Sequence, residues 1–97
     1  MSYTFYITPS AYADIKVAVD YYNSRSNGLG SRMAIEIDQM LEKIALNPLI
    51  FSVRHRHVRA AKLPSFPFLI FYKINNKAKS IQVLRVFNTY MKPFWTR

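Results

Sequence analysis

The chain has 97 residues, a formal net charge of +9, no cysteine and only two glycines. This length predicts one domain spanning 1–97, with 88–97 as a C-terminal tail, and the missing cysteine excludes a disulfide framework or a thiolate centre. No stretch approaches the roughly 20 apolar residues of a membrane span, and the first residues lack a signal-peptide pattern, so we expect a cytoplasmic protein without a membrane partner.

Charge is distributed unevenly along the chain. Residues 1–46 carry five carboxylates and four cationic side chains, a net charge of −1, whereas residues 47–97 carry ten Lys or Arg and no carboxylate, a net charge of +10. A surface that is charged only for solubility normally mixes the two signs. The asymmetry therefore predicts a polyanionic partner, either a nucleic acid or an acidic protein segment.

The N-terminal half is predicted to form a strand and two helices. Residues 3–7 have the pattern of a short strand, and Thr8-Pro9 that of a helix N-cap followed by proline. Apolar residues then recur at helical spacing over about 9–24 and over 30–46, and the short connection between the two predicts an antiparallel helical hairpin. The residues expected in its core include Ile15, Met33, Ile37, Met40, Leu41 and Ile44.

The next segment is apolar first and cationic afterwards. The apolar side chains of 49–53 are expected to pack against the core beneath a loop. The run Arg-His-Arg-His-Val-Arg at 54–59 is the densest cationic stretch of the chain. It leads into a predicted strand at about 58–63, which Pro64 ends.

Two apolar runs, 66–74 and 81–87, form the most strand-like part of the chain. The residues between them, 75–78, tolerate turn geometry, so the pattern predicts a β-hairpin. A run that is apolar at nearly every position indicates burial on both faces, near the middle of a sheet. The predicted order is β-α-α-β-β-β, an α+β fold in which a helical hairpin packs on one face of a small antiparallel sheet.

Arg85 interrupts the apolar last strand. Burying a guanidinium without a partner is costly, so we expect its side of the sheet to be partly open to solvent. Arg59 and Lys62 on the neighbouring strand are candidate neighbours, although alternation points their side chains in different directions. The alternative is an arginine that lies along the rim over apolar neighbours. Strict alternation places three apolar residues on its side of the sheet, namely Ile81, Val83 and Phe87.

The sequence contains no recognisable metal or cofactor motif. His55 and His57 are too close for a helical metal pair, and no carboxylate accompanies them in the basic half. Two glycines cannot form a Gly-rich phosphate loop, so we expect neither a metal nor another cofactor. If the chain cleaves a phosphodiester, His, Lys or Tyr must transfer the protons while arginines stabilise the charge.

Several segments taken in order resemble the RelE/ParE toxin superfamily of type II toxin–antitoxin modules, which include plasmid stabilisation systems. The resemblance implies a small basic toxin that hetero-oligomerises with an acidic antitoxin encoded by an adjacent gene. The segments that carry it are GLGSR (28–32), IALNP (44–48), VRAA (58–61), FPFLIFY (66–72) and VLRVFNT (83–89).

The branches of this superfamily differ in their targets. RelE-like members are ribosome-dependent messenger-RNA endonucleases (mRNA interferases), whereas ParE-like members inhibit DNA gyrase. Here Phe68 occupies a position where RelE-like nucleases tend to carry arginine, Asn88 stands where many relatives have histidine, and Tyr90-Met91 replaces a frequent Arg-Arg pair. Because asparagine cannot shuttle a proton, these departures favour the ParE-like branch.

The leading hypothesis is therefore a ParE-like toxin that binds and inhibits a topoisomerase. The alternatives are a RelE-like endonuclease acting on ribosome-bound messenger RNA, a degenerate and weakly toxic member, and a small nucleic-acid-binding module. As a nuclease the chain would use Arg59, Lys62, Arg85 and Tyr90. The candidate target- or antitoxin-binding residues are Arg54, Arg56, Arg59, Lys62, Arg85, Asn88, Tyr90, Lys92 and Trp95.

Overall fold

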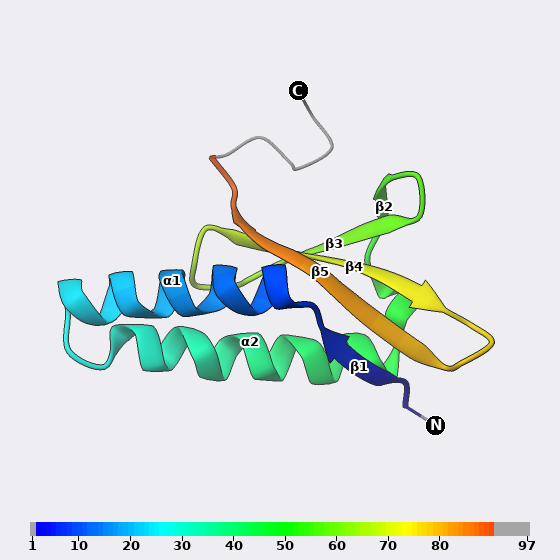
Figure 1. Ribbon diagram of the computed structural model, residues 1–97, viewed down its shortest axis with the longest axis horizontal. Coiled ribbons are helices and arrows are strands. Elements are labelled where there is room, and N and C mark those ends of the chain that lie inside the picture. The colour runs from blue at the N-terminus through cyan, green and yellow to red at the C-terminus, as the bar shows by residue number, and fades with distance from the viewer. Residues whose placement is uncertain (1, 91–97) are drawn as a thin grey trace.

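The computed structural model describes residues 2–90, so the candidate residues Lys92 and Trp95 lie outside the described part of the chain. Two helices form one layer and a five-stranded sheet forms the other (Figure 1). The order of strands in the sheet is β1-β5-β4-β3-β2. The elements are β1 (Thr4–Ile7), α1 (Pro9–Arg25), α2 (Leu29–Leu46), the 3-10 turn η1 (Pro48–Ile50), β2 (Val53–His55), β3 (Val58–Lys62), β4 (Phe68–Asn75) and β5 (Ser80–Asn88).

Both helices begin and end within one residue of their predicted bounds. The Thr8 hydroxyl accepts a hydrogen bond from the Ala11 amide at 3.2 Å, which confirms the predicted N-cap of α1. All of the core residues predicted on α2 are buried, and Ile15 of α1 packs against them. Neither helix within residues 2–90 is long and apolar enough to cross a membrane.

The start of α2 is held tightly against α1. The Asn23 side-chain oxygen accepts hydrogen bonds from the backbone amides of Gly30 at 2.7 Å and Ser31 at 3.2 Å. A Cβ atom at Gly30 would collide with the backbone carbonyl of Val19, so only glycine permits this approach of the two helices. The glycine thus explains why the predicted helical hairpin closes at this end.

The predicted β-hairpin, formed by β4 and β5, lies at the centre of the sheet. Strands β3, β4 and β5 form an antiparallel meander, and Ile70, Phe71 and Tyr72 of β4 are all buried. Ile70 and Tyr72 face the helices, whereas Phe71 belongs to a smaller cluster on the opposite face. The predicted fold class is confirmed, including burial of this strand on both faces.

Two details of the sheet differ from the prediction. Strand β1 pairs with β5 in parallel, from Thr4 opposite Ser80 to Ile7 opposite Val83, so the sheet is mixed rather than purely antiparallel. In addition, β2 pairs with β3 and makes a fifth strand, which overlaps the start of the cationic run. Alternation of side chains within a strand does not specify its partner or direction, which is why neither detail was visible in the sequence.

The prediction that residues 49–53 pack beneath a loop is largely wrong. Leu49, Ile50 and Val53 are exposed, and only Phe51 packs against the main core. Pro48 is buried instead, and its carbonyl accepts a hydrogen bond from the Tyr72 hydroxyl at 2.7 Å. With Pro48 turned inward, η1 presents the following two side chains to solvent.

Candidate interaction site

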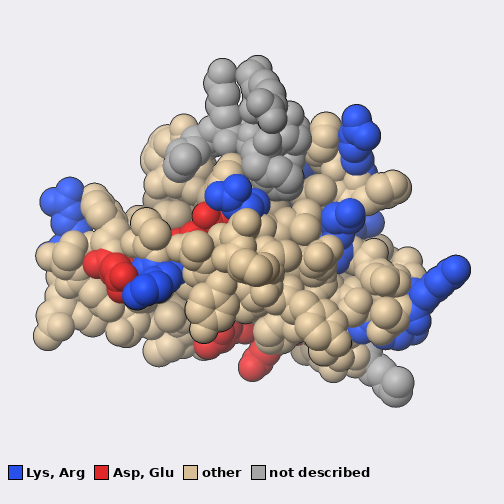
Figure 2. Space-filling view, viewed as in Figure 1, with Lys and Arg blue, Asp and Glu red and all other residues tan. Residues whose placement is uncertain are grey.

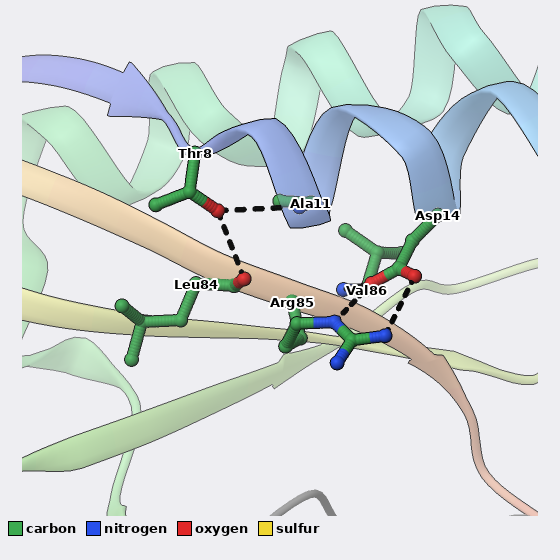
Figure 3. Close-up of polar contacts among 6 residues, drawn as sticks. All are labelled: Thr8, Ala11, Asp14, Leu84, Arg85 and Val86. Carbon is green, nitrogen blue, oxygen red and sulfur yellow. Dashed lines mark hydrogen bonds and ion pairs between the residues drawn. The ribbon is translucent and has the colours of Figure 1, made fainter.

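The end of β5 is held by the first turns of α1 (Figure 3). The Asp14 carboxylate accepts three hydrogen bonds, from Arg85 Nε at 2.8 Å, from Arg85 Nη2 at 2.9 Å and from the Val86 amide at 2.9 Å. Next to them the Thr8 hydroxyl donates to the Leu84 carbonyl at 3.0 Å. Because β1 ends at Ile7, these groups satisfy the edge of β5 where no strand continues beside it.

A β-bulge in β5 corrects the predicted orientation of Arg85. Phe71 pairs with Arg85 but Tyr72 pairs with Val83, so Leu84 is an extra residue on this strand. Alternation is therefore shifted after Leu84, and Val86 faces the main core. Arg85 lies on the side of Phe87, as predicted, but not on the side of Ile81 and Val83.

Arg85 is neutralised within its own chain. The hydrogen bond to Asp14 raises the pKa of the Arg85 guanidinium, which stays charged throughout the accessible pH range. Its central carbon lies 4.4 Å from the centre of the Phe87 ring. The Asp14 side chain is only 16% exposed, so water and salt weaken this ion pair less than an ordinary surface pair.

The two candidate cations on β3, Arg59 and Lys62, lie on opposite faces of the sheet, and only Lys62 shares a face with Arg85. Val58 and Ala60 belong to the cluster that includes Phe87, so Arg59 between them faces the helical side of the sheet. Its Nη1 donates to the Phe51 carbonyl at 2.6 Å. The exposed Lys62 follows the parity of Ala60, and its Nζ donates to the carbonyl of Leu63 at 3.0 Å.

The β2–β3 hairpin carries two further exposed cations of the candidate set. Arg54 and Arg56 are exposed, as is His57, and Arg56 takes a left-handed backbone conformation with φ 53° in the turn. Figure 2 shows both carboxylates and Lys or Arg over the helices, whereas the visible end with the β2–β3 and β4–β5 hairpins carries Lys and Arg without carboxylates. The charge asymmetry of the sequence is thus also an asymmetry in space.

The remaining described candidates lie just beyond β5. The Asn88 side-chain oxygen accepts a hydrogen bond from the Tyr90 amide at 2.9 Å, and the Tyr90 side chain is 89% exposed. The candidate residues therefore occupy separate places: the end of β5, the two faces of β3, and the β2–β3 hairpin. Within residues 2–90, no three His, Asp or Glu side chains gather in a way that could hold a metal ion.

Two features of the site were not predicted. Asp14 was not among the candidate residues, because nothing in local spacing links it to a residue 71 positions away. The second feature is a groove of about 380 Å³ beside the helices. Its lining is mainly apolar and aromatic, formed by Ile7, Tyr12, Ile15, Val19, Ala34 and Ile37. Three charged residues, Lys16, Asp20 and Asp38, complete the lining.

Comparison with known families identifies the chain. The family model described as the ParE toxin of the type II toxin–antitoxin system parDE matches residues 5–93. The chain belongs to the ParE toxin family. This family is one of toxins from type II toxin–antitoxin modules, as the resemblance in the sequence implied. None of the curated proteins matches the chain significantly.

Solved structures share the fold at low sequence identity. The chromosomal ParDE system of P. aeruginosa contains a chain with a TM-score of 0.77 and 19% identity, covering 90% of this chain and 96% of that one. The isolated E. coli RelE toxin gives a TM-score of 0.71 and 15% identity, covering 97% and 92%. The intact E. coli RelBE toxin–antitoxin complex gives 0.70 and 17%, covering 90% and 96%. This chain thus shares its fold with structures of both ParE and RelE toxins.

Proposed function

We propose that this ParE family toxin acts by binding DNA gyrase and inhibiting it, without cleaving a nucleic acid. The family match identifies the chain as a toxin of a type II module. The choice of gyrase follows the ParE branch of the superfamily, which the departures at Phe68, Asn88 and Tyr90 favour.

The observation that carries this proposal is the engagement of the candidate nuclease cations by the chain itself. A ribonuclease of this type would need cations aimed at the phosphodiester to stabilise its developing charge. Arg85 is instead neutralised by Asp14, and Arg59 faces the other side of the sheet, where it binds the Phe51 carbonyl. Three of the four candidate catalytic residues, Arg59, Lys62 and Arg85, thus donate to protein acceptors.

The end of β5 also lacks a proton-transferring group at the expected position. Asn88 accepts a hydrogen bond from the Tyr90 amide, and an amide side chain cannot act as a general acid or base at neutral pH. A toxin that acts by binding needs no such group. The amide at this position therefore supports binding over catalysis.

We further propose that an acidic antitoxin, encoded by an adjacent gene, neutralises the toxin in a hetero-oligomer. Residues 47–97 carry a net charge of +10, which would attract such a segment. Related folds occur in structures described as toxin–antitoxin complexes, from E. coli and from Mycobacterium tuberculosis. The apolar groove beside the helices offers a place for the apolar side chains of an antitoxin segment.

The test is induced expression of the toxin in bacterial cells, followed by two parallel assays. Plasmid topology reports gyrase activity, and mapping of messenger-RNA ends reports cleavage on ribosomes. We expect plasmids to relax before growth stops, with no new messenger-RNA ends. New ends within coding sequences, with supercoiling unchanged, would overturn the proposal in favour of a RelE-like endonuclease.

A further inference from the structure

An unusual number of apolar side chains lies in solvent where α2 ends and the sheet resumes. Leu46 is 72% exposed, Leu49 66%, Ile50 48% and Val53 47%. They come from eight consecutive positions, 46–53. A single exposed leucine is ordinary, but several gathered in one short segment are typical of a protein-binding surface.

This segment is anchored to the sheet on its inner side. The Pro48 carbonyl accepts a hydrogen bond from the buried Tyr72 hydroxyl, and the Phe51 carbonyl accepts one from Arg59. The Ser52 carbonyl accepts one from the Ala60 amide at 3.4 Å. The exposed side chains are therefore presented on a backbone that is already ordered, which lowers the entropic cost of binding a partner.

The accessible cations of the β2–β3 hairpin follow this apolar segment directly in the chain. Arg54 follows Val53 on β2, and Arg56 lies in the tight turn. Residues 43–62 contain five Lys or Arg and no carboxylate. A partner must therefore supply negative charge next to apolar side chains, as an acidic protein segment does.

The shape of this region favours a large partner over a wrapping peptide. Figure 1 shows the β2–β3 hairpin standing away from the helical layer, and a projecting hairpin is suited to enter a recess in a larger protein. An extended segment would find its apolar contacts in a groove, and the groove lies elsewhere, between residues of β1, α1 and α2. Phosphates of a nucleic acid would not bind the apolar part at all.

We propose that the residues Leu49, Ile50, Val53, Arg54 and Arg56, which we call the η1–β2 surface, are the contact through which this toxin binds its protein target. The surface receives an acidic segment of the target that also carries apolar side chains. This inference rests on the proposed function only in requiring a protein target. It separates Arg54 and Arg56, which contact the target, from Arg59 and Arg85, which hold the fold.

Two variants remove the two halves of the surface in the full-length toxin. Leu49→Ser/Ile50→Ser removes the apolar part, and Arg54→Glu/Arg56→Glu reverses the charge. Two matched controls make the same changes at exposed positions elsewhere in the described chain, Val17→Ser/Ile35→Ser on the helices and Lys73→Glu/Lys77→Glu on the β4–β5 hairpin. Circular dichroism and thermal unfolding verify that each variant is folded.

The readouts are growth arrest on induction, binding to purified DNA gyrase, and rescue by co-expression of the adjacent antitoxin reading frame. Both surface variants should weaken gyrase binding at least about tenfold and lose growth arrest, while both controls stay within about twofold of the wild type. Surface variants that arrest growth as the wild type does would overturn the proposal. Surface variants that still arrest growth but are no longer rescued by the antitoxin would also overturn it, because the surface would then bind the antitoxin and not the target.

The outcomes also separate this inference from the proposed function. If the wild type arrests growth without binding gyrase and both surface variants lose arrest, gyrase is the wrong target but the surface stands. If the charge reversal alone abolishes arrest, together with binding to a DNA duplex or to ribosomal RNA, the contact is a nucleic-acid interface and the proposal fails. A wild type that neither arrests growth nor binds gyrase would overturn both.

Discussion

Asp14 and Arg85, 71 residues apart in the chain, form a two-pronged ion pair with N–O distances of 2.8 and 2.9 Å. The same carboxylate also accepts the Val86 amide at the uncovered edge of β5. One side chain of α1 therefore balances the charge of the last strand and completes its backbone hydrogen bonding. The relationship explains how an arginine can interrupt an apolar strand beside the core.

Replacing Asp14 by alanine should destabilise the fold by about 2–4 kcal/mol, because Arg85 and the Val86 amide both lose their acceptor. The matched control is Asp20→Ala, which removes an exposed i, i+4 pair with Lys16 and should cost less than about 0.5 kcal/mol. Urea unfolding monitored by circular dichroism measures both. Equal effects of the two substitutions would show that the Asp14 contacts contribute no more than a surface ion pair.

Gly30→Ala should destabilise the protein by about 2–3 kcal/mol, since the new methyl group collides with the Val19 carbonyl and pushes the helices apart. Gly28→Ala is the comparison, because a methyl group there meets no atom within 4 Å and only the backbone conformation at φ 83° is strained. That strain is expected to cost about 1 kcal/mol. Differential scanning calorimetry would contradict this account if Gly28→Ala proved the more damaging change.

Stability should fall at alkaline pH because of Tyr72. Burial raises the pKa of its hydroxyl to about 12, above the ordinary value of 10.0. In the unfolded chain the group loses its proton first, so its contribution is complete below about pH 10 and is lost as pH rises towards 12. Tyr72→Phe should be less stable at neutral pH, because Pro48 loses its hydrogen bond, yet show a shallower alkaline decline. Parallel stability–pH curves for the two proteins would refute this assignment.

Association with the antitoxin should be strongly dependent on salt. Opposite charge accelerates encounter with the basic half, and ions screen this attraction beyond a Debye length of about 10 Å at 0.1 M salt. Stopped-flow measurements should show the association rate falling severalfold between about 50 and 300 mM salt, with a smaller change in dissociation. A rate that is constant over this range would mean that the charge asymmetry does not guide this partner.

The elements of the fold were predictable because their signals are local. Thr8-Pro9 marks the start of α1, and the apolar residues from Met33 to Ile44 mark the buried side of α2. The two apolar segments on either side of residues 75–78 mark the β4–β5 hairpin. Each pattern depends on residues within a few positions of one another. The parallel pairing of β1 with β5 depends on contacts about 76 positions apart and left no such signal.

The candidate site was less predictable for the same reason. Charge counting found the basic residues, but whether a cation is accessible depends on acceptors that are remote in the chain. The bulge at Leu84 reverses the expected side of Arg85 relative to Val83, and Asp14 then neutralises it. The exposure of Leu49 also follows from a distant contact, between the Pro48 carbonyl and Tyr72. Composition therefore identified which residues carry charge, and the structure separates those that are engaged within the fold from those that are accessible.

Inhibition of purified DNA gyrase is the most direct measurement of the proposed mechanism, with Asn88→His as the companion variant. Titration of the toxin into a supercoiling reaction should abolish supercoiling, and Asn88→His should inhibit equally because no proton transfer is involved. Programmed ribosomes incubated with either protein should retain intact messenger RNA. Normal supercoiling in excess toxin, together with ribosome-dependent cleavage that Asn88→His strongly enhances, would instead identify a degenerate nuclease and contradict the mechanism.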